Sequence, residues 1–291
     1  MGRISQGLPA SPADPGAGTA GLERKEAALY GSLADLPSLI VAYSGGVDSA
    51  YLAYAATRTL GTRATCITAD SASYPERHRE MALRLAREFG FQHEIIHTGE
   101  LARPEYRANP ANRCYYCKHE LYSHLTEIAH QRGIPVIADG SNADDRGDYR
   151  PGRQAAREFG VISPLDAADL TKHDIRELSR RAGLPTWDEP ASACLSSRIP
   201  YFSEVSEEKL RMIERAETIL RGLGFRICRV RHHDTIARLE FGRDEIARAV
   251  EPEMADTIDR ELRALGYAHV TVDLRGYRLG SLNDALRLRP V

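Results

Sequence analysis

The sequence SGGVDS, called the SGGVDS turn below, joins an apolar run to a helical run and could bind phosphate. Gly45 and Gly46 permit positive φ and a close approach of the backbone to a ligand. The helix that follows offers unpaired N–H groups that favour an anion, and Ser44 and Ser49 can add hydrogen bonds to phosphate oxygens. The turn is shorter than a Walker A loop and has no lysine, so Asp48 suits loop bracing or Mg²⁺. A glycine turn that only caps a strand, with Ser and Asp as helix caps, is the alternative.

Three of the five cysteines could carry sulfur or metal chemistry. Cys114 and Cys117 form a C-x-x-C motif at the predicted start of a helix, where the N-terminal field lowers the pKa of a thiol. Cys194 lies in the segment EPASACLSSRIPYF, which is typical of a mobile loop. Arg198, four residues further on, could hold a thiolate or a phosphate. A redox pair, a zinc site, a cluster site and coincidence stay open for the C-x-x-C motif, as does an incidental surface position for Cys194.

If Cys194 meets the C-x-x-C pair, the chain offers three sulfur ligands. Structural zinc would need a fourth ligand, for which His119 is a candidate. A [4Fe–4S] cluster usually takes four cysteines, so three would leave one iron open to an exogenous ligand such as hydrosulfide. Such an open iron would suit sulfur delivery. Cys66 and Cys228 lie in predicted strands, and we expect them to be small buried hydrophobic residues.

The elements that position these residues follow from the hydrophobic pattern. Strands and helices alternate over residues 36–185, which predicts an α/β fold with a doubly wound parallel sheet and helices on both faces. The ligand crevice of such a sheet lies at the carboxyl ends of its strands. The SGGVDS turn and a second segment, DGSNADD, both follow predicted strands. The predicted strands are residues 38–43, 64–69, 93–97 and 135–138, and the predicted helices run to about residue 60, over 75–89 and to about residue 132.

The chain divides into three predicted parts. Residues 1–20 are rich in Pro, Gly, Ala and Ser and are expected to form a disordered tail. Residues 21–200 form the domain with the parallel sheet, which a short helix over residues 23–33 precedes. Residues 201–291 form a small separate α/β domain. Its predicted elements are helices over 206–220 and 245–250, an exposed strand over 226–232 and a strand over 270–274.

Composition excludes several classes of protein. The 291 residues include 39 basic and 41 acidic side chains, and the net charge of −2 lacks the electrostatic pull of most nucleic-acid-binding proteins. The apolar runs are too short to span a bilayer, and the N-terminus has no apolar segment of a secretory signal. Five cysteines are too few and too odd in number for a disulfide framework. We therefore expect a cytoplasmic protein with reduced thiols and neither a nucleic-acid nor a membrane partner.

Several motifs together resemble a known family. SGGVDS is similar to the pyrophosphate-binding loop of the ATP pyrophosphatase (PP-loop) superfamily, whose fold is adenine nucleotide alpha-hydrolase-like. The motifs VAYSGGVDS, TADS, NPANRCYYCKHELY, DGSNADDRGDYRPG, ACLSSRIPY and DLRGYRLGSLN resemble the LarE family, the ATP-dependent sulfur transferases (sulfur insertases) of nickel-pincer nucleotide cofactor biosynthesis. The resemblance runs from about residue 23 to residue 286.

The resemblance implies a reaction in two stages. The carboxylates of pyridinium-3,5-biscarboxylic acid mononucleotide are adenylated with release of PPi, and a sulfur source then displaces AMP to leave a thiocarboxylate. One branch of the family sacrifices the sulfur of the loop cysteine, and another binds a [4Fe–4S] cluster that carries an extra sulfide through three cysteines. Because Cys114, Cys117 and Cys194 are all present, the resemblance favours the cluster, with sacrifice of Cys194 as the alternative. It also implies ATP and Mg²⁺ as cofactors and a homo-oligomer.

The resemblance further suggests which residues surround the ligands. The pyrophosphate end of ATP is expected at Ser44, Gly45, Gly46, Asp48 and Ser49. Beside the adenosine we expect Ala42, Ala69, Asp70 and Ser71, with Gly140 and Asn142 on the facing wall and Asp144 or Asp145 near Mg²⁺, although the DGSNADD segment could be an ordinary Asx-rich turn. The substrate phosphate or an interface anion is assigned to Glu217, Arg229, Arg231 and Arg278. Arg229 and Arg231 alternate and so point to one face of a strand, but solvated surface arginines are the alternative.

Rival functions predict different features. A PP-loop tRNA thiolase also combines SGG-x-DS with cysteines but predicts a basic surface, which the balanced charge does not favour. A PP-loop ligase that uses ammonia would leave the cysteine set without a role. A non-catalytic nucleotide-binding module would bind ATP without releasing PPi, and it leaves the acids of DGSNADD unexplained.

Overall fold

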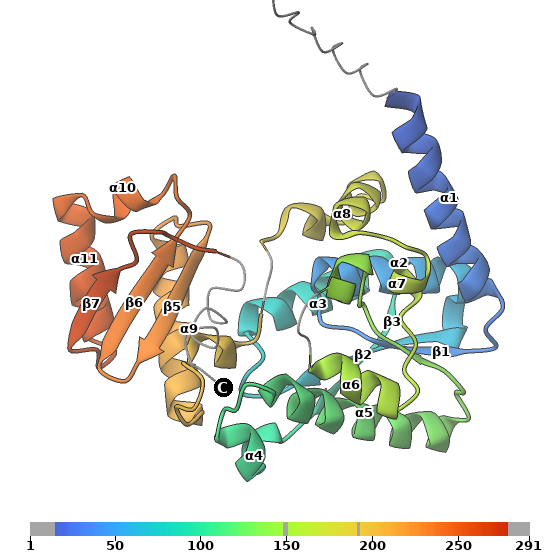
Figure 1. Ribbon diagram of the computed structural model, residues 1–291, viewed down its shortest axis with the longest axis horizontal. Coiled ribbons are helices and arrows are strands. Elements are labelled where there is room, and N and C mark those ends of the chain that lie inside the picture. The colour runs from blue at the N-terminus through green and yellow to red at the C-terminus, as the bar shows by residue number, and fades with distance from the viewer. Residues whose placement is uncertain (1–14, 148–150, 191–192, 279–291) are drawn as a thin grey trace, which may run out of the picture.

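The computed structural model describes residues 15–147, 151–190 and 193–278. Figure 1 shows two bodies side by side, a larger one built from the N-terminal two thirds of the chain and a smaller one built from the C-terminal third. Helix α1 (Pro15–Ala34) already runs from Pro15, so it begins before the predicted helix start at residue 23. The first part of the expected tail, residues 1–14, lies outside the described residues. No helix in the described ranges is long and apolar enough to cross a membrane.

A four-stranded parallel sheet is the centre of the larger body, with the strand order β3-β2-β1-β4. Its two central strands are buried and apolar, as expected for a sheet that is covered on both faces. This confirms the predicted α/β class and the parallel sheet. The strands are β1 (Leu39–Ala42), β2 (Ala64–Asp70), β3 (Gln92–His97) and β4 (Ile137–Ala138).

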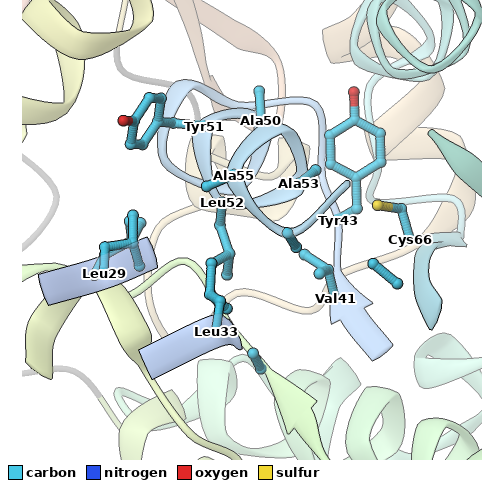
Figure 2. Packing of buried hydrophobic residues seen from close by; sticks show 14 of the residues in the cluster. Leu29, Leu33, Val41, Tyr43, Ala50, Tyr51, Leu52, Ala53, Ala55 and Cys66 are labelled. Carbon is cyan, nitrogen blue, oxygen red and sulfur yellow. The ribbon is translucent and has the colours of Figure 1, made fainter. Parts of the chain in front are cut away.

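Helices cover both faces of this sheet because β1 is apolar on both sides. Leu39 and Val41 point into one hydrophobic cluster, and Ile40 and Ala42 point into the other. The first cluster, seen in Figure 2, packs α1, α2 (Val47–Leu60), α3 (Glu76–Phe89), α7 (Pro164–Ala167) and α8 (Lys172–Arg181) on one face. The second cluster packs α5 (Arg113–Arg132) and α6 (Gly152–Glu158) on the opposite face.

The short elements of the larger body connect these layers. They are η1 (Gly61–Arg63), η2 (Glu100–Ala102), α4 (Pro104–Arg107), η3 (Ala143–Gly147), η4 (Pro185–Asp188) and η5 (Leu195–Arg198). The segment of residues 193–203, which contains η5 and is called the Cys194 loop below, leads into the smaller body.

The smaller body is a three-stranded mixed sheet packed on helices. Strand β5 (Cys228–His233) pairs antiparallel with β6 (Ile236–Phe241), which pairs parallel with β7 (His269–Val272). Its helices are α9 (Glu207–Gly222), α10 (Ile246–Ala249) and α11 (Pro252–Arg263). The prediction of an exposed strand over residues 226–232 is wrong in one respect, because β5 is buried in all but its last residue, beneath α9 and η5.

Candidate active site

The SGGVDS turn closes tightly between β1 and α2. Gly45 has φ of +67°, and a Cβ on it would lie 3.1 Å from both the Cβ of Ala82 and the carbonyl oxygen of His78. Glycine meets both requirements, because it adopts positive φ without strain and has no Cβ to collide with these atoms. Gly46 caps α2 without a side-chain hydrogen bond from any described residue. The first N–H groups of α2 are therefore not capped by a side chain, which favours the phosphate cradle over the helix-cap alternative.

The two serines of the turn hold its shape. The Ser49 hydroxyl accepts a hydrogen bond from the Ser44 N–H at 3.1 Å and donates one to the Gly46 carbonyl at 3.1 Å. The hydroxyls of Ser44 and Ser49 lie 3.1 Å apart and share a further hydrogen bond. Ser44 is exposed and Ser49 is buried. Of the two hydroxyls, that of Ser44 is therefore the one within reach of a ligand.

The segment of residues 139–145, called the DGSNADD loop below, approaches the turn so closely that its second residue must be glycine. A Cβ on Gly140 would lie 2.9 Å from the Ser49 nitrogen and 3.2 Å from its Cα. Asp139 fixes the preceding backbone by accepting hydrogen bonds from the hydroxyls of Tyr122 and Ser163. The loop and the turn therefore form two facing walls at the carboxyl ends of β1 and β4, as the sequence predicts.

Asx-type hydrogen bonds brace the DGSNADD loop internally. The Asn142 N–H donates to Asp145 at 3.1 Å, and the Asp144 N–H donates to the Asn142 side chain at 3.0 Å. Asp145 is buried and Asp144 is exposed, so Asp144 is the better placed of the two for Mg²⁺. The Asx turn and the Mg²⁺ assignment are compatible, because solvent reaches the Asp144 side chain.

A lysine that the sequence analysis did not single out completes this wall. Lys172, the first residue of α8, donates from its ammonium group to the carboxylate of Asp48, and its N–H donates to Asp144 at 2.8 Å. Asn142 also donates to Asp48, at 3.3 Å. Lys172 and Asp48 are 124 positions apart, so local spacing gives no signal for the pair.

The residues expected beside the adenosine lie where β1 and β2 end. Ala42 is the last residue of β1, and Asp70 the last residue of β2 after Ala69. Ser71 belongs to a buried hydrogen-bond network, in which its hydroxyl donates to Glu100 at 2.6 Å. Glu100, which is 2% exposed, also accepts from Ser73 and Thr98.

The three predicted sulfur residues come close to one another from two elements. Cys114 and Cys117 lie in the first turns of α5, and Cys194 immediately precedes η5. Burial is the main cause that raises the pKa of both Cys114 and Cys117, and Cys194 adds a smaller electrostatic contribution at each, so Cys194 lies within electrostatic range of the pair. Cys66 and Cys228 are buried in the cores, as predicted.

The expected lowering of the thiol pKa at the start of α5 is wrong. Burial, followed by the charges of Glu100 and Cys194, raises the pKa of Cys117. Cys114 is accessible to solvent, yet protein surrounds it closely enough that desolvation, followed by the Cys194 thiol, raises its pKa. Desolvation therefore outweighs the field of the helix at both thiols.

The donor set argues against zinc. His119 contacts Phe159, with ring centroids 5.0 Å apart, and shares a hydrogen bond with Arg103 at 3.5 Å. Within the described ranges, no three or more His, Cys, Asp or Glu side chains are grouped so that they could hold a metal ion. Among the described residues, the three cysteines therefore form no preformed ligand set for zinc or for a cluster.

A buried arginine lies between the cysteines. Arg113 is 3% exposed and donates to the Asn109 side chain and, at 2.9 Å, to the carbonyl of Ser196. Both acceptors are neutral, while negative charge on Cys194 and Cys114 raises the pKa of Arg113. The guanidinium therefore supplies positive charge to the sulfur site and joins α5 to the Cys194 loop.

Arg198 anchors the same loop from the other side. It is 2% exposed, donates to the carbonyls of Ala193 and Cys194 at 2.7 and 3.0 Å, and binds both carboxylate oxygens of Glu217. Despite burial, Arg198 lowers the pKa of Glu217 to about 2. Glu217 also accepts from Arg221 at 2.7 Å. Glu217 therefore orients Arg198 and Arg221. A bound anion would contact arginines and not the Glu217 carboxylate.

The arginines of β5 are not solvated surface residues. Arg229 is 7% exposed and lies over the ring of Tyr277, 5.1 Å from its centroid. Arg231 is 6% exposed and donates to Glu240 at 2.7 Å. Arg278 is partly buried at the end of the described chain. This burial rules out the surface alternative for Arg229 and Arg231, and contacts within the protein stabilise both cations.

A continuous crevice joins the two bodies. One pocket reaches the SGGVDS turn at Gly45, Gly46 and Val47, and a second pocket contains the arginines of α9 and β5. Arg77, His78 and Pro190 line both pockets. The second pocket, called the arginine crevice below, is lined by Pro75, Arg77, His78, Pro190, Arg198, Arg221, Arg226 and Arg229. An anion in the arginine crevice would therefore lie next to the phosphate turn.

Comparison with known proteins places this geometry in a family. A family model described as asparagine synthase matches residues 35–112, which contain the SGGVDS turn. An uncharacterised protein of Synechocystis sp. is 43% identical over 265 residues, 91% of this chain and 99% of that protein. The pyridinium-3,5-bisthiocarboxylic acid mononucleotide synthase of Lactiplantibacillus plantarum is 36% identical over 266 residues, 91% of this chain and 96% of that protein. The chain belongs to the LarE family.

Membership in the LarE family makes the chain an enzyme of the sulfurtransferase type with an ATP-using domain, as the motifs predict. A more distant relative, the glutamine-hydrolysing GMP synthase of Aeropyrum pernix, is 25% identical over 202 residues, 62% of this chain and 39% of that protein. The Synechocystis and Lactiplantibacillus relatives, by contrast, match nearly the whole chain, including the smaller body.

Proposed function

We propose that this LarE-family enzyme adenylates the carboxylates of pyridinium-3,5-biscarboxylic acid mononucleotide and converts them to thiocarboxylates. The observation that carries the proposal is the continuity of the SGGVDS turn with the arginine crevice, whose Arg198 also holds the carbonyl of Cys194. Nucleotide, anionic substrate and sulfur can thus meet in one place. The name of the Lactiplantibacillus plantarum relative supports the choice of substrate.

In the first stage, a substrate carboxylate oxygen attacks the α-phosphorus of ATP, and the bond to the bridging oxygen breaks as PPi leaves. The Ser44 hydroxyl and the first N–H groups of α2 would bind the PPi as its negative charge develops. Asp48 and Asp144 offer the carboxylate oxygens that Mg²⁺ prefers beside phosphates. The arginine crevice would hold the substrate phosphate, since Arg221, Arg226 and Arg229 are among its lining residues.

In the second stage, a sulfur nucleophile attacks the acyl carbon and AMP leaves. We assign the sulfur to a [4Fe–4S] cluster on Cys114, Cys117 and Cys194, because the LarE resemblance implies it and thiolates are the ligands such clusters take. When bound, the cluster would supply sulfide as the nucleophile. Arg113 would balance its negative charge, and Arg198 would hold the Cys194 loop in place. Sacrifice of the Cys194 sulfur is the alternative source.

Two further features belong to the proposal. The LarE resemblance suggests a homo-oligomer in which the smaller body makes contacts. Free thiols at all five cysteines agree with a reducing compartment, for which we propose the cytoplasm.

The test measures both stages separately under anaerobic conditions. PPi release is followed with ATP and the mononucleotide, and thiocarboxylate formation is followed by mass spectrometry. We expect Cys194→Ala to release PPi but form no thiocarboxylate, and the matched control Cys228→Ala, in the C-terminal core, to do both. PPi release that is independent of the mononucleotide would contradict the proposed substrate.

The same samples identify the sulfur source. After reconstitution with iron and sulfide, a visible charge-transfer absorbance that is present in the wild type and lost in Cys114→Ala supports the cluster. Absence of that absorbance, with conversion of Cys194 to dehydroalanine after one turnover, would establish the sacrificial route instead.

A further inference from the structure

Arg77, in the first turn of α3, lies where the two pockets meet. It is one of the three residues that line both the pocket at the SGGVDS turn and the arginine crevice. The carbonyl oxygen of the next residue, His78, is 3.1 Å from where a Cβ on Gly45 would lie, so this part of α3 touches the turn. The Arg77 guanidinium therefore lies beside any group that is bound between the nucleotide and the substrate phosphate.

The protein uses only part of the hydrogen-bonding capacity of Arg77. Its Nη2 atom donates to both carboxylate oxygens of Glu189, at 2.8 and 2.7 Å, while within the described ranges neither Nε nor Nη1 donates a hydrogen bond. The Arg77 side chain is 42% exposed. By contrast, Arg198 in the same crevice is 2% exposed and donates to Glu217 and to two backbone carbonyls. Arg77 can therefore bind a further anion.

The pair of Arg77 and Glu189 is also easily exchanged. Both side chains are partly exposed, so water screens their attraction. The planar guanidinium presents parallel N–H groups whose spacing matches the two oxygens of a carboxylate. A ligand carboxylate can thus bind Arg77 beside Glu189 or in its place.

We infer, on the basis of the proposed function, that Arg77 is a specificity-determining residue that binds the carboxylate of the mononucleotide that is not being adenylated. In the first round this group is the second ring carboxylate. In the second round it is the thiocarboxylate formed in the first round, which is also an anion. The same contact therefore serves both rounds.

The chemistry of adenylation assigns Arg77 to the group that does not react. The reacting carboxylate must give an electron pair to the α-phosphorus, and two charged hydrogen bonds from Arg77 would withdraw electron density from its oxygens. The other carboxylate lies across the pyridinium ring and changes no bond. With the substrate phosphate in the arginine crevice and this carboxylate on Arg77, two fixed points orient the ring so that the reacting carboxylate faces the nucleotide.

Glu189 limits how strongly the site rejects a substrate with a single carboxylate. A binding site rejects an analogue most strongly when its own polar group is left buried and unpaired. Here Glu189 accepts from Arg77 when no ligand carboxylate is present. We therefore expect a preference of about tenfold to a hundredfold for the biscarboxylate, rather than complete exclusion of a monocarboxylate.

The test compares two substrates on the full-length chain, pyridinium-3,5-biscarboxylic acid mononucleotide and its analogue with only the 3-carboxylate. The readout is the second-order rate constant (kcat/KM) of PPi release, which nonproductive binding of the analogue does not change. We expect Arg77→Met to lower this constant by about tenfold or more for the biscarboxylate and to leave it within about twofold for the monocarboxylate. Calorimetric affinity for α,β-methylene-ATP with Mg²⁺ should stay within about twofold of the wild type, because Arg77 is not assigned to the triphosphate.

The matched control is Arg132→Met. Arg132 is also 42% exposed and also donates to both oxygens of a glutamate, Glu94, but it lines neither pocket. This variant should keep the preference of the wild type.

Three results would overturn the inference. An equal loss for both substrates in Arg77→Met would indicate a structural role or a contact with the nucleotide, and an unchanged preference would show that Arg77 does not contact the second carboxylate. Complete exclusion of the monocarboxylate by both the wild type and Arg77→Met would show that another residue recognises that group. Absence of PPi release from both mononucleotides in the wild type would instead contradict the proposed function.

Discussion

At the scale of single residues, buried charges hold the Cys194 loop in place. The side chain of Arg198 is buried beneath the loop, and its charge is balanced by Glu217, which is 1% exposed and also binds Arg221. Replacement of such a pair by apolar residues can be neutral, but removal of one partner leaves the other as an uncompensated buried charge. Glu217 thus holds the loop by its ion pair with Arg198, a residue of the loop itself.

Loss of the Glu217 charge is therefore predicted to destabilise the folded protein. We expect Glu217→Gln to lower the free energy of unfolding by about 3–5 kcal/mol, because Arg198 stays buried without its counter-charge. Urea denaturation measures the change. The control on the same helix is Glu207→Gln, which breaks an exposed pair with Arg211 and is expected to cost less than about 0.5 kcal/mol. A loss below about 1 kcal/mol for Glu217→Gln would show that Arg198 finds other compensation.

Residues whose role depends on neighbours in the chain were predictable from the sequence, and residues whose role depends on distant partners were not. Gly45 was identified because SGGVDS is a continuous string in a strand–turn–helix context. Lys172 was missed because its partner Asp48 lies on another element, 124 positions away. Arg113 stands directly before Cys114 in the string NRCYYC, a signal that could have suggested a cation at the sulfur site.

At the scale of elements, an asparagine of the larger body holds the second half of the Cys194 loop. Asn109 is fully buried with φ of +52°, and its side-chain amide donates to the carbonyls of Pro200 and Ser203 at 2.7 and 3.0 Å. Its own carbonyl accepts from the Phe202 N–H at 2.9 Å. Residues 200–203 of the loop are therefore held by hydrogen bonds to Asn109 rather than by regular secondary structure.

Removal of the Asn109 side chain is predicted to loosen the Cys194 loop selectively. We choose Asn109→Gly because glycine tolerates positive φ, so that only the amide group is lost. Hydrogen exchange of the backbone N–H groups of Phe202 and Val205 should become faster by about tenfold or more, as the local opening free energy falls by about 1–3 kcal/mol, while β1 and β2 stay protected.

Asn112→Gly is the control for this experiment. Asn112 precedes α5 at the N-cap position, and its side chain accepts no capping hydrogen bond from the described residues of the helix. Its replacement should leave exchange in the Cys194 loop unchanged. Equal protection of Phe202 in Asn109→Gly and in the wild type would show that the loop is held by other contacts.

The strands show where the sequence pattern predicts burial correctly and where it does not. Strands β1 and β2 were predictable because both faces are apolar, as a doubly covered sheet requires. Strand β5 contains Arg229, Arg231 and His232, so its alternation indicated an exposed face. Glu240 on the neighbouring strand and the Ser197 carbonyl satisfy Arg231 inside the molecule, and polarity alone cannot reveal such pairing.

At the scale of the whole molecule, the functional crevice lies between two bodies with separate hydrophobic cores. Helix α3 of the larger body presents Arg77 and His78 to the arginines of α9 and β5 in the smaller body. Protein carboxylates balance part of this charge, since Arg77 pairs with Glu189, and Arg198 and Arg221 share Glu217. The smaller body thus contributes arginines to the lining of the crevice.

The pKa of His78 reflects its burial among these arginines. Burial, followed by the charges of Arg77, Arg198, Arg221 and Arg229, lowers the pKa of His78 from 6.5 to about 4. In the unfolded chain the imidazole takes up a proton near pH 6.5, whereas in the folded protein it stays neutral down to about pH 4. The unfolded state therefore binds more protons between these values, and stability must fall as the pH is lowered through this window.

We therefore expect the wild type to lose more stability than His78→Gln when the pH is lowered from 7 to 4. The difference should be on the order of 2 kcal/mol in the free energy of unfolding, after allowance for partial exposure of the imidazole. Urea denaturation at several pH values measures it, and the other histidines contribute equally to both proteins. His97→Gln, which removes a side chain that is 85% exposed, should follow the wild type. Parallel pH profiles for the wild type and His78→Gln would mean that the imidazole is protonated in the folded crevice, as it would be if a bound anion already neutralised the arginines.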